Sequence, residues 1–380
     1  MKSRITANVG IFAVFLGLLN SISAPAANAV VVTATGTDPS VCDQIVNNAT
    51  GVIASRLSGG DCLVKFTSTT TSYEWTAPAN LYSVTYLIVG GGGSGGTGWD
   101  STGAAGGGGG MVLSGTTTIS ANSLYTVTVG AGGSQSTNGR GAYNGNSGNP
   151  STFSNLTALG GGFGYTSRQN SGVSQAGGAA QVGTTTAPKG GSSGAGGNGS
   201  GTSAGAGGAG VSNSITSSAV IYGAGGAGGA NTGTSTTGAA GGANTGKGGG
   251  GGIGGNASSA SGGAGGSGVV IIRYSTTPAT VNSFALLGNP TTATFRNPTT
   301  INIDVSISSK ITFLANGKRI PGCISKSANG SGSSYIATCN WRPTVKNSTR
   351  ITAQIRPTSP GVATFSSEIM ISVVPRTGTR

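Results

Sequence analysis

The stretch that decides the fold begins with Leu87-Ile88-Val89 running into Gly90-Gly91-Gly92-Gly93, and it ends with Gly268-Val269-Val270-Ile271-Ile272-Arg273-Tyr274. Between these two apolar strands lie tracts of glycine mixed with Ala, Ser, Thr and Asn. The chain holds 75 glycines in 380 residues, well above the usual share of about 7%. Ordering glycine costs more backbone entropy than ordering any other residue. Composition alone therefore favours a flexible linker.

Apolar segments inside the tracts argue for order instead. They lie at Met111–Leu113, Leu124–Val129 and Ile221–Tyr222, and a linker has no use for them. Bare glycine backbones in extended helices with three residues per turn can approach closely and hydrogen-bond laterally. Collagen is excluded, because glycine does not recur at every third position and only 13 prolines are present. Runs such as Gly106–Gly110 and Gly248–Gly252 predict a bundle of antiparallel glycine helices whose tract ends form exposed tips.

Several short motifs follow one another across this region. They are Tyr73-Glu74-Trp75-Thr76-Ala77-Pro78, Val84 to Gly93, Tyr125 to Gly133, Ser151-Thr152-Phe153 and Gly268 to Tyr274. In this order they resemble the bacterial and phage glycine-rich domain, here spanning residues 67–275. The resemblance implies a small β-sandwich with projecting polyglycine II helices, used in surface and receptor-binding proteins. It implies no catalysis.

The first 29 residues predict an export signal peptide. Lys2 and Arg4 make a basic start, Ile11–Leu19 an apolar centre, and Ala27-Asn28-Ala29 a small-residue cleavage site. The apolar run is shorter than the roughly 20 residues that a membrane-spanning helix needs. We therefore expect a chain from Val30 that is secreted or displayed at the cell surface and does not span the membrane.

Export would place the four cysteines, Cys42, Cys62, Cys323 and Cys339, in an oxidising compartment. Four cysteines permit three pairings. Pairing of Cys42 with Cys62 and of Cys323 with Cys339 is favoured, because each pair lies inside one module; free thiols are the alternative. We expect residues 30–66 to form a small N-terminal unit closed by the first of these disulfides.

The composition changes after residue 275, where the glycine tracts stop. Short alternating strands are expected at Ile301–Val305, Lys310–Ala315, Tyr335–Trp341, Ile351–Ile355 and Glu368–Val374. Asn316-Gly317 is a strong hairpin signal. Residues 276–380 therefore predict an antiparallel β-sandwich, and the whole chain is expected to be mainly β. The hairpin at Ala315–Cys323 and the strand at Ala337–Pro343 resemble the Ig-like repeat of bacterial surface proteins, although the two cysteines lie closer in sequence than an antibody pair.

Most of the positive charge lies in this last module. From Thr277 on, eleven Lys and Arg oppose Asp304 and Glu368, which gives +9 of the chain's net +13. A basic face attracts anionic envelope polymers such as teichoic acids or acidic glycans, and nucleic acid for the same reason, but no specific nucleic-acid motif accompanies the charge. The candidate basic contacts are Lys318, Arg319, Arg342 and Lys346. A solvated surface that only aids solubility is the alternative.

A few aromatic and basic residues lie in polar segments between the glycine tracts. Trp99, Tyr143, Tyr165 and Arg168 are the candidate ligand-contact residues, because aromatic residues beside Asn, Gln or Arg have the composition of an adaptable binding surface. Solvated loops with incidental aromatic residues are the alternative. Phe153 and Tyr222 are instead predicted to pack in the core.

Enzymatic activity is not expected. The chain contains no histidine, which removes the commonest general base and metal ligand. With the cysteines in disulfides, zinc lacks ligands, and neither a metal nor a cofactor is expected. The leading hypothesis is an exported adhesive or envelope-associated protein. A structural matrix protein without a specific ligand is the alternative, and binding to ice or crystal surfaces through Thr and Ser rows is a more remote one. The ligand and the oligomeric state stay open.

Overall fold

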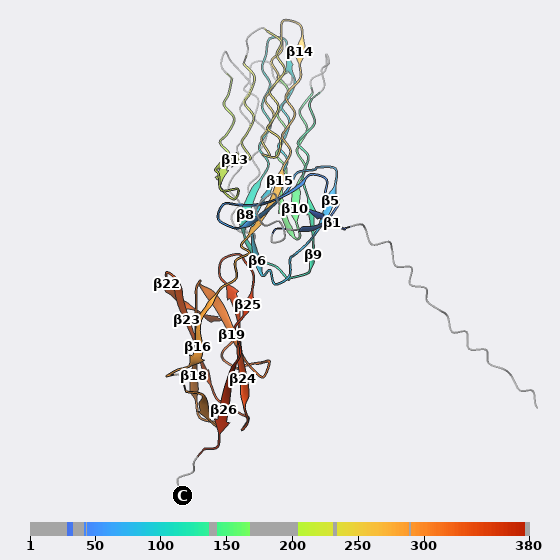
Figure 1. The fold of residues 1–380 in the computed structure, drawn as a ribbon. Helices are drawn as coiled ribbons and strands as arrows, with labels where there is room; N and C mark the ends of the chain where they lie inside the picture. Colours follow the sequence, from blue (N-terminus) through green and yellow to red (C-terminus); the bar gives the residue numbers. More distant parts are fainter. Residues whose placement is uncertain are drawn as a thin grey trace, which may run out of the picture.

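The structure is a computed structural model that describes residues 29–32, 42, 44–136, 143–167, 204–230, 234–288 and 290–376. The expected signal peptide lies outside these residues except for Ala29. The glycine tracts, a small β-sandwich at their base and a C-terminal β-sandwich follow one another along a long axis (Figure 1). Regular structure in the described residues is almost entirely β, as predicted.

The β-sandwich at the base of the tracts consists of two antiparallel sheets. The five-stranded sheet has the order β3 (Val52–Arg56), β4 (Cys62–Phe66), β15 (Val269–Tyr274), β6 (Ser83–Val89) and β8 (Val112–Thr118). The six-stranded sheet has the order β1 (Ala29–Val32), β2 (Gln44–Asn47), β5 (Ser72–Thr76), β9 (Leu124–Thr128), β10 (Ser151–Phe153) and β11 (Leu156–Ala158). The strands that open and close the glycine region, β6 and β15, are neighbours, with Val89 opposite Val269. The tracts between them therefore leave and rejoin one sheet.

Side-chain alternation along β6 and β15 gives the five-stranded sheet two buried faces. Tyr86, Ile88 and Ile272 lie in the main core together with Trp75 and Phe153 of the other sheet. The tilted rings of Trp75 and Phe153 have centroids 6.1 Å apart. Phe153 is 1% exposed, so its predicted role as a packing residue is confirmed.

The opposite face of the five-stranded sheet is covered by a hairpin. Strands β12 (Val211–Asn213) and β13 (Val220–Tyr222) form it, and Tyr222 lies in a second core with Leu87 and Ile271. Tyr222 is 4% exposed, which confirms that it is a packing residue. Burial raises the pKa of its phenol above the ordinary value.

The prediction of a separate unit at residues 30–66 is wrong. Strands β1 and β2 extend the six-stranded sheet, whereas β3 and β4 extend the five-stranded sheet. Phe66 at the end of β4 is fully buried in the main core and pairs with Val270 of β15. Without β4, the apolar strand β15 would be an unpaired edge. The N-terminal segment is therefore part of the same sandwich.

The C-terminal sandwich also has two sheets around one core. The first has the order β16 (Val281–Leu286), β18 (Thr299–Val305), β23 (Ser334–Trp341) and β22 (Asn329–Ser331). The second has the order β17 (Thr292–Thr294), β26 (Ile369–Val374), β24 (Thr349–Pro357), β19 (Ser309–Ala315) and β20 (Lys318–Arg319), with β21 (Lys326–Ser327) on β19 and β25 (Thr364–Phe365) on β24. All five strands predicted after residue 275 are present. Asn316 and Gly317 have φ values of 48° and 76°, the left-handed pair that a two-residue hairpin turn requires.

Both sandwiches contact each other directly. Leu81 forms an antiparallel β-bridge with Val362, and the Tyr82 N–H donates to the Gly361 carbonyl at 3.1 Å. The Arg356 guanidinium carbon lies 4.7 Å from the centroid of the Tyr82 ring, a cation–π contact. The backbone contacts and the cation–π contact together hold the C-terminal sandwich against the first sandwich.

Candidate functional site

Residues 90–97 continue β6 and form the central tract of the glycine bundle. Their backbone N–H groups turn to three different neighbours in succession and repeat every third residue, at N···O distances of 2.8–3.0 Å. Residues 90, 93 and 96 donate to Met111, Gly108 and Ala105; residues 91, 94 and 97 donate to Asn149, Asn146 and Tyr143; residues 92 and 95 donate to Gly266 and Gly263. Three residues per turn is the period of a polyproline II-type helix. The tract is therefore a polyglycine II helix, as predicted.

Three further tracts donate to the carbonyls of the central tract. Gly161 and Gly164 donate to residues 91 and 94, Gly249 and Gly252 to residues 93 and 96, and Gly133 to residue 92. In the described part of the bundle the central tract thus has six neighbours. The three acceptor tracts run antiparallel to it, whereas residues 159–167 and 246–254 run parallel. The predicted antiparallel arrangement holds for tracts that follow one another in sequence, but neighbours in space include parallel tracts.

Glycine is required in this packing because the neighbouring tracts lie too close for a side chain, and not because the backbone adopts a positive φ. An added Cβ at any glycine from 90 to 96 would lie 2.0–2.2 Å from a backbone carbonyl oxygen of the next tract. At Gly93, for example, that oxygen belongs to Gly162, at 2.1 Å. Real Cβ atoms do not approach an oxygen this closely, and a backbone carbonyl cannot rotate out of the way as a side chain can. The close spacing of the hydrogen-bonded tracts therefore restricts these positions to glycine.

Hydroxyl side chains replace glycine at a few interior positions and bond to neighbouring tracts. The Ser94 Oγ accepts a hydrogen bond from the Asn146 N–H at 2.7 Å. The Ser136 Oγ accepts one from the Gly262 N–H at 2.8 Å and one from the Thr97 hydroxyl at 3.1 Å. All three hydroxyl residues are fully or almost fully buried. They add side-chain hydrogen bonds to the backbone hydrogen bonds between tracts.

At the far end of the bundle, away from the sandwiches, the described residues include segments that lie far apart in sequence. The central tract ends in β7 (Gly98–Trp99), which pairs with β14 (Ser259–Ala260); β14 lies at the far end in Figure 1. The Thr97 N–H donates to the Tyr143 carbonyl at 3.0 Å, and the Thr97 carbonyl accepts from the Ser167 N–H at 3.2 Å. The Trp99 N–H donates to the Ser167 Oγ at 2.8 Å. These bonds place segments 97–99, 143–144 and 165–167 side by side; we call this the distal end.

Three of the four predicted ligand-contact residues therefore meet at the distal end. Tyr143 and Tyr165 are 47% and 38% exposed, while Trp99 is partly buried. The Phe163 and Tyr165 rings form an edge-on pair with centroids 5.2 Å apart, which holds the Tyr165 ring in place. Phe163 was not among the predicted contact residues, although it lies two residues before Tyr165 in the sequence. Arg168 lies outside the described residues.

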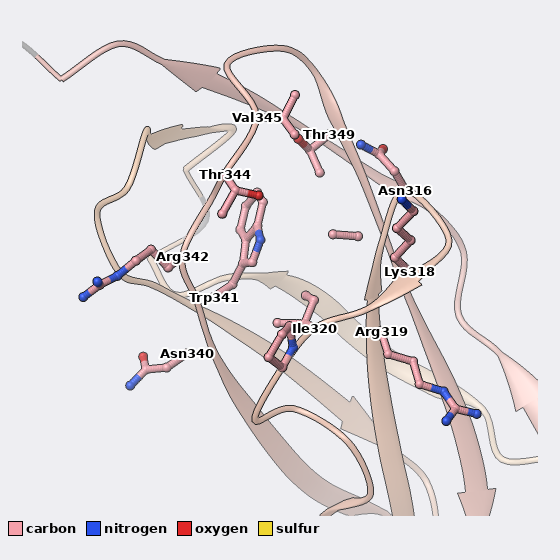
Figure 2. A pocket seen from close by; sticks show the side chains of 12 residues that line it. Asn316, Lys318, Arg319, Ile320, Asn340, Trp341, Arg342, Thr344, Val345 and Thr349 are labelled. Carbon is pink, nitrogen blue, oxygen red and sulfur yellow. The ribbon is translucent and has the colours of Figure 1, made fainter.

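A second surface feature lies in the C-terminal sandwich and brings together three of the four predicted basic residues. Lys318, Arg319 and Arg342 line a cavity of about 580 Å³ between the β19–β20 hairpin and the connection from β23 to β24. Figure 2 shows the Trp341 indole projecting into the ring of lining residues, with Ile320 beside it. The Arg319 and Arg342 side chains extend away from the middle of the cavity on opposite sides. Basic residues therefore lie around the rim of an apolar cavity, and the charged ends of Arg319 and Arg342 are directed away from its middle.

Lys346 lies outside this cavity. Its ammonium group is 5.2 Å from the centroid of the Phe295 ring, and the Arg296 guanidinium lies at the same distance from that ring. Two cations thus share one aromatic ring on the surface. The four predicted basic contacts therefore do not form a single cluster.

Both predicted disulfides are present, Cys42–Cys62 and Cys323–Cys339. The second one joins the turn after β20 to strand β23, and so ties two walls of the cavity together. Gly322 in that turn has φ of 75°, in the left-handed region that favours glycine.

Within the described ranges, no three His, Cys, Asp or Glu residues are grouped so that they could hold a metal ion. No helix in the same ranges has the length and apolarity to cross a bilayer.

Comparison with known families identifies the family of the glycine bundle. Residues 67–275, more than half of the chain, match the sequence model of the glycine-rich domain family. The protein belongs to this family. No curated protein matches the sequence. In this glycine-rich domain protein the fold extends beyond the matched range, because β3 and β4 precede residue 67 and still complete the five-stranded sheet.

Proposed function

We propose that this chain is an exported, non-enzymatic surface protein that binds a partner through the distal end of its glycine bundle. The observation that supports this most is the convergence of three distant segments, which hold Tyr143 and Tyr165 exposed on a scaffold packed by its backbone. Tyrosine supplies large contact area at low entropic cost, and a rigid support lowers the cost of binding further. Export is supported by the two disulfides and by the basic, apolar and small-residue pattern of residues 1–29.

The test compares aromatic residues at and away from the distal end. Purified full chain is labelled and its binding to intact bacteria is measured by flow cytometry. Changing Tyr143→Ala and Tyr165→Ala together should reduce cell binding at least about tenfold, the loss of about 1.4 kcal/mol. Phe365→Ala is the matched control, because Phe365 is 59% exposed in the C-terminal sandwich. Equal binding by both variants would favour the alternative of a structural matrix protein without a specific ligand.

The C-terminal sandwich is proposed to be an Ig-like module that acts as a basic spacer. Its first sheet, β16-β18-β23-β22, corresponds in order to strands A, B, E and D of the immunoglobulin fold, and β19-β24-β26 corresponds to C, F and G. The disulfide departs from that fold, because it links the turn after β20 to β23 and does not join strands B and F. The strand order therefore supports the resemblance, whereas the cysteines do not contribute to it.

We further propose that the basic residues of this module contact anionic envelope polymers. Lys318, Arg319 and Arg342 have no carboxylate within 4 Å among the described residues, so their charge is available to an external anion. Binding of the full chain to isolated cell walls should fall steeply between about 0.05 and 0.5 M salt, because exposed charges are screened. Binding that does not change over this range would contradict the electrostatic contact.

A further inference from the structure

The cavity beside Trp341 has an apolar interior, which a flat basic surface lacks. Its walls are formed largely by Ala315, Ile320, Pro321, Trp341 and Val345. Its volume of about 580 Å³ lies within the range of about 300–1,000 Å³ that small-molecule sites occupy. A polyanion would need only the exposed Lys and Arg side chains. An apolar interior favours a ligand with an apolar body.

The cavity is also held open by the fold. The Cys323–Cys339 disulfide ties the turn after β20 to β23, and the Ile320 N–H donates to the Phe313 carbonyl at 2.9 Å. On the other side, the Asn316 Oδ1 accepts a hydrogen bond from the Arg350 N–H at 2.9 Å. Covalent and hydrogen bonds therefore fix both the hairpin wall and the strand wall. A preformed cavity binds a small ligand without a large ordering cost.

The charges around the opening determine whether a cationic or an anionic ligand is favoured. This module has only two carboxylates, and both are engaged elsewhere. Asp304 accepts hydrogen bonds from the Ser334 hydroxyl and the Tyr335 N–H, and Glu368 forms an ion pair with Arg350 at 3.2 Å. The three cations at the opening are therefore not neutralised by the described part of the chain. Positive potential at the mouth of a low-dielectric cavity attracts an anion.

We propose that this cavity binds a small amphipathic organic anion. The apolar part of the ligand packs against Trp341, Ile320 and Val345, and its carboxylate, sulfonate or phosphate lies at the opening near Lys318. The source can be a free aromatic or acyl acid, or the end of a lipid or glycan that carries the same groups. This site is independent of the distal end. It shares Lys318, Arg319 and Arg342 with the proposed wall contact, but dye binding and wall binding are measured separately, so either can fail without the other.

The experiment uses anilinonaphthalene sulfonate, a fluorescent aromatic anion, with the folded full chain. We expect saturable binding at one site that weakens as salt is added. The neutral analogue phenylnaphthylamine should bind at least about tenfold more weakly, which corresponds to about 1.4 kcal/mol. Inorganic sulfate should displace the dye only at far higher concentration, because it lacks the apolar part.

Variants then assign the dye to the cavity. Lys318→Glu and Val345→Asp should each weaken binding about tenfold, the first by reversing a charge at the opening and the second by placing a charge inside. Lys326→Glu, at an exposed position outside the cavity, makes the same charge change as Lys318→Glu and should alter binding less than about twofold. Val345 is 48% exposed, so its replacement leaves the fold intact, which thermal unfolding checks.

Any of the following results would overturn the proposal. Equal affinity for the neutral analogue would remove the anionic requirement. Unchanged dye binding in Val345→Asp, or equal losses in Lys318→Glu and Lys326→Glu, would place the dye elsewhere or reduce its binding to net charge. Displacement by sulfate at the same concentration as by an unlabelled aromatic sulfonate would contradict the apolar subsite.

Discussion

The glycine bundle and the C-terminal sandwich both exclude water, but they do so with opposite parts of the chain. In the bundle, a neighbouring carbonyl oxygen lies where a Cβ would be, and every N–H from Gly90 to Thr97 is hydrogen-bonded to another tract. In the sandwich, Ile303, Phe313 and Ile355 fill the interior. Removing atoms should therefore damage the sandwich, whereas adding atoms should damage the bundle.

The largest expected effect comes from creating a cavity in the sandwich. Phe313 is fully buried, so Phe313→Ala should destabilise the C-terminal sandwich by about 3–5 kcal/mol. Phe365→Ala, at an exposed phenylalanine, should change stability by less than about 1 kcal/mol. Denaturant unfolding followed by tryptophan fluorescence measures both. If the two changes had similar effects, side-chain packing would not be what stabilises this module.

The bundle should respond to the smallest possible addition. Gly93→Ala places a methyl group 2.1 Å from the Gly162 carbonyl oxygen and should destabilise the bundle by about 3 kcal/mol. Gly59→Ala is the matched control, because a Cβ at Gly59 meets nothing within 4 Å and the residue does not have positive φ. That variant should be neutral or slightly stabilising. Amide hydrogen exchange of the tract residues distinguishes the two, and fast exchange in both the wild type and Gly93→Ala would contradict an ordered bundle.

A smaller effect tests the hydroxyl groups inside the bundle. Ser94→Ala removes the acceptor of the Asn146 N–H and should cost about 1 kcal/mol, because that donor loses its partner. Ser134→Ala changes an exposed serine in a neighbouring tract and should stay within about 0.5 kcal/mol. Thermal unfolding of both variants gives the difference. Equal values would mean that the backbone bonds alone determine the stability of the bundle.

The smallest effects concern one ion pair in each half of the molecule. Arg273 and Asp61 pair at 2.8 Å with side chains 29% and 25% exposed, whereas Arg350 and Glu368 pair at 3.2 Å with both side chains about half exposed. Asp61→Asn should therefore cost about 0.5–1 kcal/mol and Glu368→Gln less than about 0.5 kcal/mol. Both values should shrink in 1 M salt. A larger loss for Glu368→Gln would reverse the expected dependence on burial.

Much of this fold could be predicted because its signals are local. Glycine tracts bounded by apolar strands predicted polyglycine helices, Asn316-Gly317 predicted a hairpin, and the spacing of the cysteines favoured the observed pairs. The position of β4 beside β15 could not be predicted, because these strands lie some two hundred residues apart and share only an apolar pattern that fits many partners.

The candidate sites, too, could be predicted only in part. Trp99, Tyr143 and Tyr165 were selected by composition, and that they meet at one end depends on hydrogen bonds between tracts that no sequence period reveals. Trp341 was noted only as the end of a strand. Arg342 was predicted only as a basic contact and Ile320 only as part of the hairpin, and the closed sandwich brings them together around a cavity.

The three-residue rotation of hydrogen bonds in residues 90–97 also sets how such a scaffold can change in length. Adding three residues to each tract returns every N–H to the same neighbour and moves the distal end outward by about 9 Å. Adding one or two residues turns each N–H toward the wrong tract. The bundle can therefore lengthen only by whole helical turns, whereas the loops that connect the tracts beyond Trp99 can change length by any number of residues.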